Sequence, residues 1–310
     1  MMKAYLSFPL KDSSVKALQN AGVEVFINPK KDRKDRPSGK ALGLILREYD
    51  IVVLSVTQNL EKYALKDIKS PKIVATVSVG LDHIDPAFFE SPFIKVISLK
   101  DSNAISVAEH ILAMAFALNK RLHEANHLTV EGKGCRSNLQ GRNVELFGKT
   151  LGLVGAGTIN RELAKMARAF NMKVLCYTRN PQNYEKFAEF VDLDTVLKES
   201  DIINVSIPFA PNLICKDKIA LMKPTATFIN TSNSAGQITD ISALINYADK
   251  NEAFKVGLDI DPNDFGALFQ KYRTNVLVSP HVACYTAEAS NRMDDEVTQK
   301  ILESIAEIKK

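Results

Sequence analysis

The chain has 310 residues, more than the ~250 at which a single hydrophobic core usually stops growing, so two domains are predicted. Hydrophobic residues make up 45% and charged residues 25%, a balance that excludes disordered, collagen-like and low-complexity proteins. The formal net charge is only +4, and the one dense basic stretch, 30–36, is interrupted by acids and lacks aromatic neighbours. A solvated loop is therefore expected there, rather than a surface for nucleic acid.

The sequence carries no sign of export, membrane insertion or metal binding. No apolar run approaches the ~18 residues that span a bilayer, and the apolar start of the chain ends too early for a signal peptide. The 4 cysteines include no C-x-x-C pair, so neither a zinc site nor a disulfide framework is indicated. We expect a cytoplasmic protein with no membrane contact and no bound metal.

The first part of the chain alternates short apolar runs with segments of helical periodicity. The expected strands are 4–8, 23–27, 51–56, 72–76 and 95–98, and the expected helices are 13–21 and 42–49. An alternation of strand and helix is typical of a parallel sheet with crossover helices. One small α/β unit is therefore predicted here.

A long apolar helix is predicted from Val107 to about Leu122. Its apolar residues occur at nearly every turn, with neither Gly nor Pro among them. A helix that is apolar all round is buried, in a core or at a subunit interface. The polar, Gly-bearing segment that follows, 131–148, is expected to be a link over the surface.

A second α/β unit is predicted from residue 149 onwards. Its expected strands are 150–154, 173–177, 202–206, 227–230, 256–259 and 276–279, and its expected helices are 158–170 and 291–308. The fold class predicted for the whole chain is α/β, with two parallel-sheet units.

A glycine-rich turn joins the first strand of this unit to its first helix. The turn reads Gly155, Ala156, Gly157, Thr158, Ile159 and Asn160. Between a strand and a helix, such a turn is typical of dinucleotide binding, because the glycines let pyrophosphate approach and the helix N-terminus offers free N–H groups. The alternative is a turn that is glycine-rich for purely structural reasons.

The third glycine of the G-x-G-x-x-G pattern is replaced by Asn160. The usual role of that glycine is close packing of the helix on the strand. We therefore expect a slightly lifted helix or a shifted partner, and weaker dinucleotide binding.

The second strand of this unit ends at Thr178 and Arg179, where an acid for the ribose 2′-hydroxyl is usual. Without that carboxylate a 2′-phosphate is not repelled, and Arg179 can pair with it while Thr178 donates a hydrogen bond. The sequence therefore favours NADP over NAD. The alternative is an exposed loop arginine that binds nothing.

Several segments together resemble the D-2-hydroxyacid dehydrogenase family, in the order in which that family carries them. They are VGLDHID at 79–85, NAISVAEH at 103–110, GKTLG at 148–152, MKP at 222–224 before FINT at 228–231, GLDI at 257–260 and SPHVA at 279–283. One such segment would be a weak signal, but six in order are specific.

The resemblance implies two doubly wound parallel-sheet domains. A flavodoxin-like substrate domain would consist of 1–98 with 288–310, and a Rossmann dinucleotide-binding domain of 99–287. It implies a homodimer formed through the long helix near 107–122. The implied reaction transfers a hydride between NAD(P)H and C2 of a 2-oxo or 2-hydroxy acid or a related compound.

The resemblance assigns the proton donor to His281, since imidazole titrates near neutral pH. Its carboxylate partner would be Asp264, where the family usually has Glu. The shorter Asp can still pair with His281 if the loop comes closer.

The resemblance also implies residues that contact cofactor and substrate. Asp259 would lie near the nicotinamide carboxamide, and Pro208 and Thr231 would also contact the cofactor. The backbone of Val79 and Gly80 would hold the substrate carboxylate beside Asn103. Gly80 and Asn103 have structural alternatives, as a turn residue and as a helix cap.

The match fails at the position of the family's substrate-clamping Arg, which is Asn233 here. Arg binds a carboxylate through two charged hydrogen bonds, whereas Asn is neutral. One hypothesis is an active enzyme with a changed substrate. The alternative is a catalytically impaired protein that binds dinucleotide as a sensor, like the corepressors on this fold.

Overall fold

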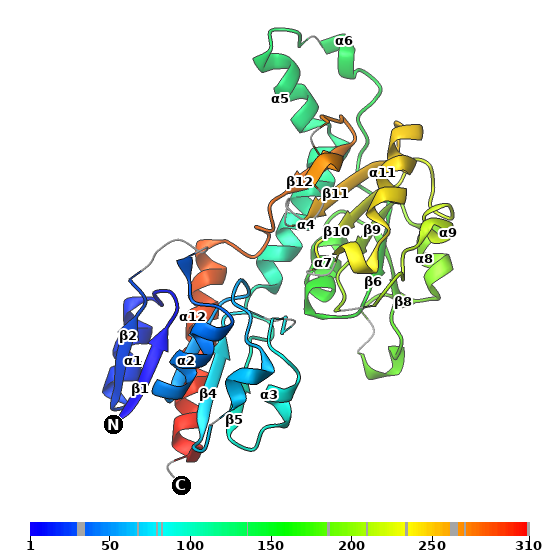
Figure 1. Ribbon diagram of the computed structural model, residues 1–310. Helices are drawn as coiled ribbons and strands as arrows, with labels where there is room; N and C mark the ends of the chain where they lie inside the picture. Colours follow the sequence, from blue (N-terminus) through cyan, green and yellow to red (C-terminus); the bar gives the residue numbers. More distant parts are fainter. Residues whose placement is uncertain are drawn as a thin grey trace. The chain divides into compact units, whose positions relative to one another are not determined.

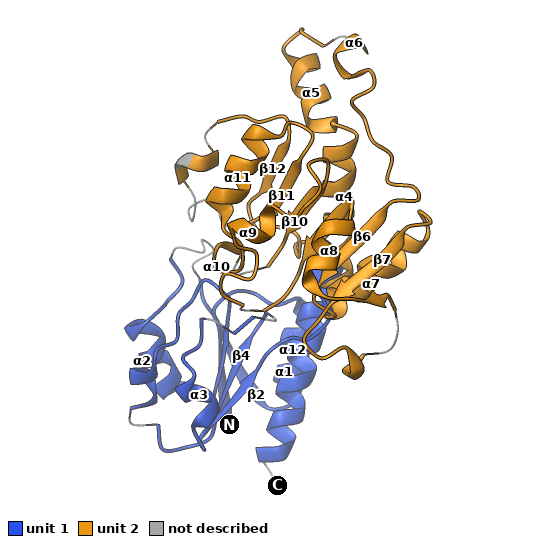
Figure 2. Ribbon diagram, turned by 90° about the vertical axis from the view of Figure 1, so that its right-hand side faces the viewer, with its two compact units in different colours: residues 1–103, 287–310 blue, residues 104–286 orange. Residues whose placement is uncertain are grey.

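The computed structural model describes residues 1–29, 35–66, 68–78, 80–81, 83–134, 136–184, 187–208, 210–232, 235–260, 266–269 and 271–308. It divides into two compact units, residues 1–103 with 287–310 (unit 1) and residues 104–286 (unit 2), coloured separately in Figure 2. The substrate and nucleotide roles expected for domains 1–98 with 288–310 and 99–287 stay predictions. Most of the basic stretch, 30–34, and the candidate residues Val79, Asn233 and Asp264 lie outside the described residues.

Unit 1 contains a five-stranded parallel sheet in the order β2-β1-β3-β4-β5. Its strands are β1 (Met2–Leu6), β2 (Val23–Ile27), β3 (Ile51–Leu54), β4 (Lys72–Thr76) and β5 (Ile94–Ile97). Its helices are α1 (Asp12–Asn20), α2 (Lys40–Glu48), α3 (Ala87–Glu90) and α12 (Ala287–Ile308), with a short 3-10 turn at Lys62–Leu65. The last helix of the chain thus completes the unit built by the first hundred residues.

The central strands of unit 1 read as unbroken apolar runs because helices cover both faces of the sheet. Alternate residues of β3 point to opposite sides: Val53 packs with Val297 and Ile301 of α12, and Val52 packs with Leu46 of α2. The continuous hydrophobicity that predicted buried strands is therefore a direct consequence of this three-layer packing.

Unit 2 contains a seven-stranded parallel sheet in the order β12-β11-β10-β9-β6-β7-β8. Its strands are β6 (Thr150–Val154), β7 (Lys173–Tyr177), β8 (Glu189–Phe190), β9 (Ile202–Val205), β10 (Thr227–Asn230), β11 (Lys255–Asp259) and β12 (Val276–Ser279). Its helices are α4 (Ala104–Asn119), α5 (Leu122–Val130), α6 (Arg136–Leu139), α7 (Thr158–Arg168), α8 (Leu193–Glu199), α9 (Lys216–Ile219), α10 (Ala235–Ile238) and α11 (Ile241–Lys250), with 3-10 turns at Pro181–Asn183 and Gly266–Phe269. The prediction of two doubly wound parallel sheets is confirmed.

Helix α4 forms part of the core of unit 2. Its buried face, including Val107, Ile111 and Met114, packs with Leu163 of α7 against the sheet. Helix α8 and helix α11 cover the other face through Val196 and other apolar residues. Burial of the long apolar helix is thus explained by the fold of a single chain.

The structure ends the long helix earlier than the sequence suggests. Helix α4 stops at Asn119, and Arg121, with φ of 50°, turns the chain into the separate helix α5. Arg121 and Glu124 are both buried and form an ion pair of 2.9 Å that stabilises this corner. Figure 1 shows α5 and α6 standing away from the seven-stranded sheet. The expected surface link, 131–148, therefore contains one short helix.

Candidate functional site

The candidate cofactor residues gather at the carboxyl edge of the seven-stranded sheet. Gly155 follows β6, Thr178 follows β7, Pro208 lies beyond β9, Thr231 follows β10, Asp259 ends β11 and His281 lies beyond β12. The strand order reverses between β6 and β9, and open parallel sheets bind ligands in the crevice outside such a switch point. The topology therefore brings together residues that are far apart in the sequence.

The glycine turn has the geometry that a dinucleotide requires. Gly155 has φ of 105°, and a Cβ there would lie 2.5 Å from Ile207 Cγ2 and 2.8 Å from the Ser206 carbonyl oxygen. Gly157 has extended backbone, and a Cβ there would meet no atom within 4 Å. Helix α7 starts directly after Gly157 without a side-chain cap. The free N–H groups of its N-terminus therefore lie beside the open space at Gly157, which we call the cradle. These features fit a pyrophosphate group.

Asn160 is fully buried and replaces direct glycine packing by hydrogen bonds. Its Nδ2 donates to the carbonyl oxygens of Val154 (3.1 Å) and Gly155 (2.8 Å), and its Oδ1 accepts from Asn204 Nδ2 at 2.7 Å. Asn204 also donates to Ser206 Oγ at 2.9 Å. The amide thus occupies the space between α7 and β6, where the sequence suggested a lifted helix.

The end of β7 presents an exposed cation. Thr178 is half-buried and Arg179 is exposed. No hydrogen bond or ion pair is found for Arg179 in the described part of the chain. Because β7 is the neighbour of β6 in the sheet, this guanidinium lies on the same edge as the glycine turn.

Beneath the turn, burial raises the pKa of the Cys176 thiol to about 12.

Asp259 is a buried carboxylate that organises the loop after β12. It is 2% exposed and accepts hydrogen bonds from the backbone N–H groups of Val282 and Ala283, both at 2.9 Å. Its Oδ1 also accepts from the Ser279 hydroxyl. Three donors from one short segment fix that segment against the end of β11.

The same loop holds His281 in a left-handed conformation. His281 has φ of 52° and is half-buried, and its backbone N–H donates to the Ser279 carbonyl oxygen at 3.0 Å. Ser106 of α4 donates to the Ala283 carbonyl oxygen at 2.6 Å. A left-handed residue of this kind persists only when its surroundings hold it. Among the described residues the imidazole has no hydrogen-bond partner; Asp264, its expected partner, lies outside them.

The candidate substrate residues of unit 1 follow strand β4. Ser78 Oγ donates to the Gly80 carbonyl oxygen at 2.7 Å and lies 2.9 Å from Thr76 Oγ1, which is 3.0 Å from His83 Nε2. Asn103 is half-buried and directly precedes α4. The end of β4 is thus polar, and sequence reasoning had not assigned roles to Ser78 or His83.

Sequence reasoning also missed His110, Asn204, Ser206 and Ser279. His110 Nε2 lies 2.9 Å from Ser279 Oγ and 3.8 Å from Asp259 Oδ1. Ser206 Oγ lies 3.1 Å from Thr231 Oγ1. His110 and Ser279 lie in the sequence segments that resemble the family, at 103–110 and 279–283. Their contacts were not predictable, because contacts between such distant residues require the fold.

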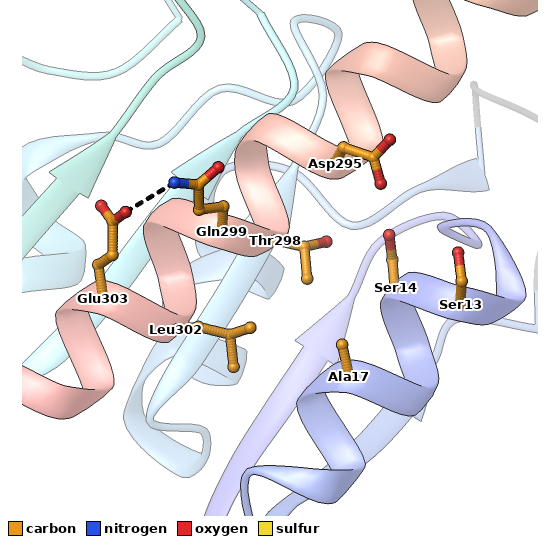
Figure 3. A pocket seen from close by; sticks show the side chains of 8 residues that line it. All are labelled: Ser13, Ser14, Ala17, Asp295, Thr298, Gln299, Leu302 and Glu303. Carbon is orange, nitrogen blue, oxygen red and sulfur yellow. Dashed lines mark hydrogen bonds between the residues drawn. The ribbon is translucent and has the colours of Figure 1, made fainter.

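Unit 1 also has an open groove of about 400 Å³ between α1 and α12, shown in Figure 3. Its lining is Ser13, Ser14, Ala17, Asp295, Thr298, Gln299, Leu302 and Glu303. None of the candidate site residues lines this groove. Its acidic rim does not suit an anionic dinucleotide or a carboxylate substrate.

Comparison with known proteins shows which family the chain resembles in sequence. The model of the D-isomer specific 2-hydroxyacid dehydrogenase NAD-binding domain matches residues 112–283. The chain is 31% identical over 310 residues to a hydroxypyruvate reductase of Thermotoga maritima, covering 98% of each protein. It is 32% identical over 315 residues to a glyoxylate reductase of Thermococcus litoralis, covering 97% of this chain and 92% of that protein.

Solved structures agree over nearly the whole chain. An acyclic imino acid reductase in complex with NADPH and D-Arg superposes with a TM-score of 0.84 at 26% identity, covering 99% of this chain and 98% of the other. The D-lactate dehydrogenase of Aquifex aeolicus with NAD and lactic acid superposes with a TM-score of 0.78 at 27% identity, covering 98% of this chain and 95% of the other.

None of the described helices combines the length and the apolar character that a membrane span requires.

Proposed function

The chain belongs to the D-isomer specific 2-hydroxyacid dehydrogenase family, and from this premise we propose that it is an NADPH-preferring reductase of 2-oxo acids or closely related compounds. The observation that carries the proposal is the open cradle at Gly157 on the same sheet edge as the clamped turn of His281. A protein that only sensed dinucleotide would not need His281 held in this way, and the named relatives are reductases.

The preference for NADPH rests on Arg179. Its exposed guanidinium, at the end of β7 and with no acid among its sequence neighbours 176–182, suits a 2′-phosphate. Titration of the protein with NADPH and NADH, followed by cofactor fluorescence, tests this. We expect Arg179→Ala to weaken the binding of NADPH by about 10- to 100-fold, because a charge-assisted hydrogen bond is lost. The affinity for NADH should stay unchanged. Arg168→Ala, which removes an exposed arginine at the C-terminal end of α7, is the matched control. Equal weakening of the binding of both cofactors by Arg179→Ala would refute the preference.

In the proposed mechanism His281 delivers a proton to the substrate oxygen. When bound, the nicotinamide supplies the hydride at its C4. The chain's own residues then have two tasks: Asp259 holds the loop after β12, and the His281 imidazole donates the proton to the alkoxide that develops. His281→Gln should lower kcat by ~100-fold or more, as losses of general acids do, while NADPH affinity stays the same. Normal turnover by this variant would remove His281 from the mechanism.

The substrate carboxylate is proposed to contact the backbone of Val79 and Gly80 and the side chain of Asn103. Asn233, in place of the family's Arg, leaves this site without its usual charged clamp. We therefore propose a substrate that differs from glyoxylate or pyruvate in shape or charge. Steady-state oxidation of NADPH over a panel of 2-oxo acids tests this; highest activity on glyoxylate would contradict it.

A second candidate is reduction of a 2-imino acid, formed by condensation of a 2-oxo acid with an amine. It is favoured by the likeness to the acyclic imino acid reductase and by the neutral Asn233. In this reaction the hydride adds to the imine carbon and a proton to its nitrogen, which gives a secondary amine. The same panel with and without added amines separates the two, because only imine reduction requires the amine and yields an N-substituted amino acid.

A homodimer through the helix near 107–122 and a cytoplasmic location complete the proposal. At the end of this segment Leu122 is 57% exposed, whereas Leu112 and Phe116 are half-buried against the core of unit 2. Light scattering should give twice the mass of one chain. Leu122→Glu should shift the mass towards the monomer, whereas Leu44→Glu in unit 1, at a residue that is 59% exposed, should not. A dimer unaffected by Leu122→Glu would argue against this interface.

A further inference from the structure

A second histidine, His110 of α4, approaches the carboxylate that organises the proposed active site. Its Nε2 lies 2.9 Å from Ser279 Oγ and 3.8 Å from Asp259 Oδ1. Its side chain is 25% exposed, whereas that of Asp259 is 1% exposed. His110, Ser279 and Asp259 come from α4, β12 and β11 and meet inside unit 2, beside the loop of His281.

The direction of these hydrogen bonds follows from the single proton of the Ser279 hydroxyl. A serine hydroxyl has one proton, and here it goes to Asp259 Oδ1, which acts as an acceptor. The Ser279 oxygen can then only accept from His110, so Nε2 of His110 carries a hydrogen. That hydrogen is present in both the neutral Nε2–H tautomer and the imidazolium. Protonation at Nδ1 therefore adds a positive charge without breaking the hydrogen bond.

Within the described residues, Asp259 has no cationic side-chain partner other than His110. Among the residues that the structure describes, neither Lys nor Arg pairs with its carboxylate, and its remaining donors are the neutral N–H groups of Val282 and Ala283. Glu109, the neighbour of His110 on α4, is exposed, and His281 lies two residues beyond Ser279. The charge of Asp259 is thus balanced or unbalanced according to the protonation of His110.

The net charge at Asp259 and His110 matters because of where Asp259 lies in the sheet. A dinucleotide lies across the switch point with one mononucleotide half on each side. The glycine turn and Arg179 are on the side of β6 and β7, so the nicotinamide half belongs on the side of β9 to β12, where Asp259 ends β11. An oxidised nicotinamide ring is a cation and a reduced one is neutral, so only the oxidised form gains from an unbalanced carboxylate.

We propose that His110 is a protonation-dependent counter-ion of Asp259 that sets the relative affinity for oxidised and reduced cofactor. This inference rests on the proposed function, since it requires the nicotinamide to bind at this edge. With His110 neutral, Asp259 attracts the oxidised ring. With His110 protonated, the local charge is cancelled and the preference moves to the reduced cofactor, so that lower pH promotes reduction of substrate.

The test is the ratio of the dissociation constants of NADP⁺ and NADPH, measured from pH 8.5 to 5.5 without substrate. Both cofactors carry the same 2′-phosphate, whose own titration cancels in the ratio. In the wild type we expect the ratio to rise by about fivefold as the pH falls, as expected for a partly screened charge pair. His110→Gln keeps an N–H donor and cannot be protonated, so its ratio should not change with pH.

The controls separate this inference from others. His281→Gln should keep the pH dependence of the wild-type ratio, and in histidine-labelled protein NMR should show that Nε2 of His110 carries its hydrogen at every pH measured. If the ratio of dissociation constants in His110→Gln still changed with pH as in the wild type, the role of His110 would be overturned. Loss of this pH dependence in His281→Gln instead would also overturn it. Binding of both cofactors with a ratio independent of pH would also overturn it and leave the proposed function intact. Failure to bind either cofactor would refute the proposed function itself.

Discussion

A methyl group added at Gly155 and one added at Gly157 should have opposite consequences, although only Ala156 separates the two residues. At Gly155 a Cβ would lie 2.5 Å from Ile207 Cγ2 and 2.8 Å from a backbone oxygen, with φ of 105°. Backbone strain of ~1–3 kcal/mol and crowding of ~1–3 kcal/mol add to about 2–6 kcal/mol of lost stability. At Gly157 the added Cβ meets no atom within 4 Å.

Gly157→Ala should therefore fold at least as well as the wild type, with a gain of ~0.4–1 kcal/mol from a stiffer unfolded chain. Its methyl group would occupy the cradle, so NADPH should bind at least ~10-fold more weakly, or about 1.4 kcal/mol. Urea unfolding of the cofactor-free protein and NADPH titration measure the two effects separately. Wild-type stability in Gly155→Ala, or wild-type affinity in Gly157→Ala, would refute this interpretation of the turn.

Three further outcomes are expected. Asp259→Asn should lower the unfolding midpoint and kcat together, because an amide N–H would face a backbone donor at a loss of ~1–3 kcal/mol; an unchanged midpoint would contradict the clamp. Because burial raises the pKa of Cys176 to about 12, a thiol reagent should modify it only after unfolding, and modification of the native protein would show otherwise. Asn233→Arg should reduce activity on the native substrate, since the new charge would lack a partner; a large gain on pyruvate or glyoxylate would instead indicate a lost family activity.

Much of the fold was predictable because burial on both faces of a parallel sheet leaves a direct trace in the sequence. The unbroken run at β3 and the glycine turn after β6 needed no tertiary information. The corner at Arg121 did not follow from periodicity, since the apolar pattern runs on through Leu122. The chain turns there because Arg121 adopts a left-handed conformation and pairs with Glu124, a contact that hydrophobic spacing does not encode.

From the sequence alone, site residues could be proposed only where one residue suffices to indicate a chemistry, as at Gly157 and Arg179, and their roles stay predictions. Asn160 shows the limit. The pattern marks it as a departure, because glycine usually brings helix and strand together. Its effect is decided by Asn204, 44 residues away, which donates to its Oδ1, and by two carbonyl oxygens of the turn. A buried amide is costly when unpaired and stabilising when paired, so the same substitution weakens or supports the turn according to a partner that only the fold identifies.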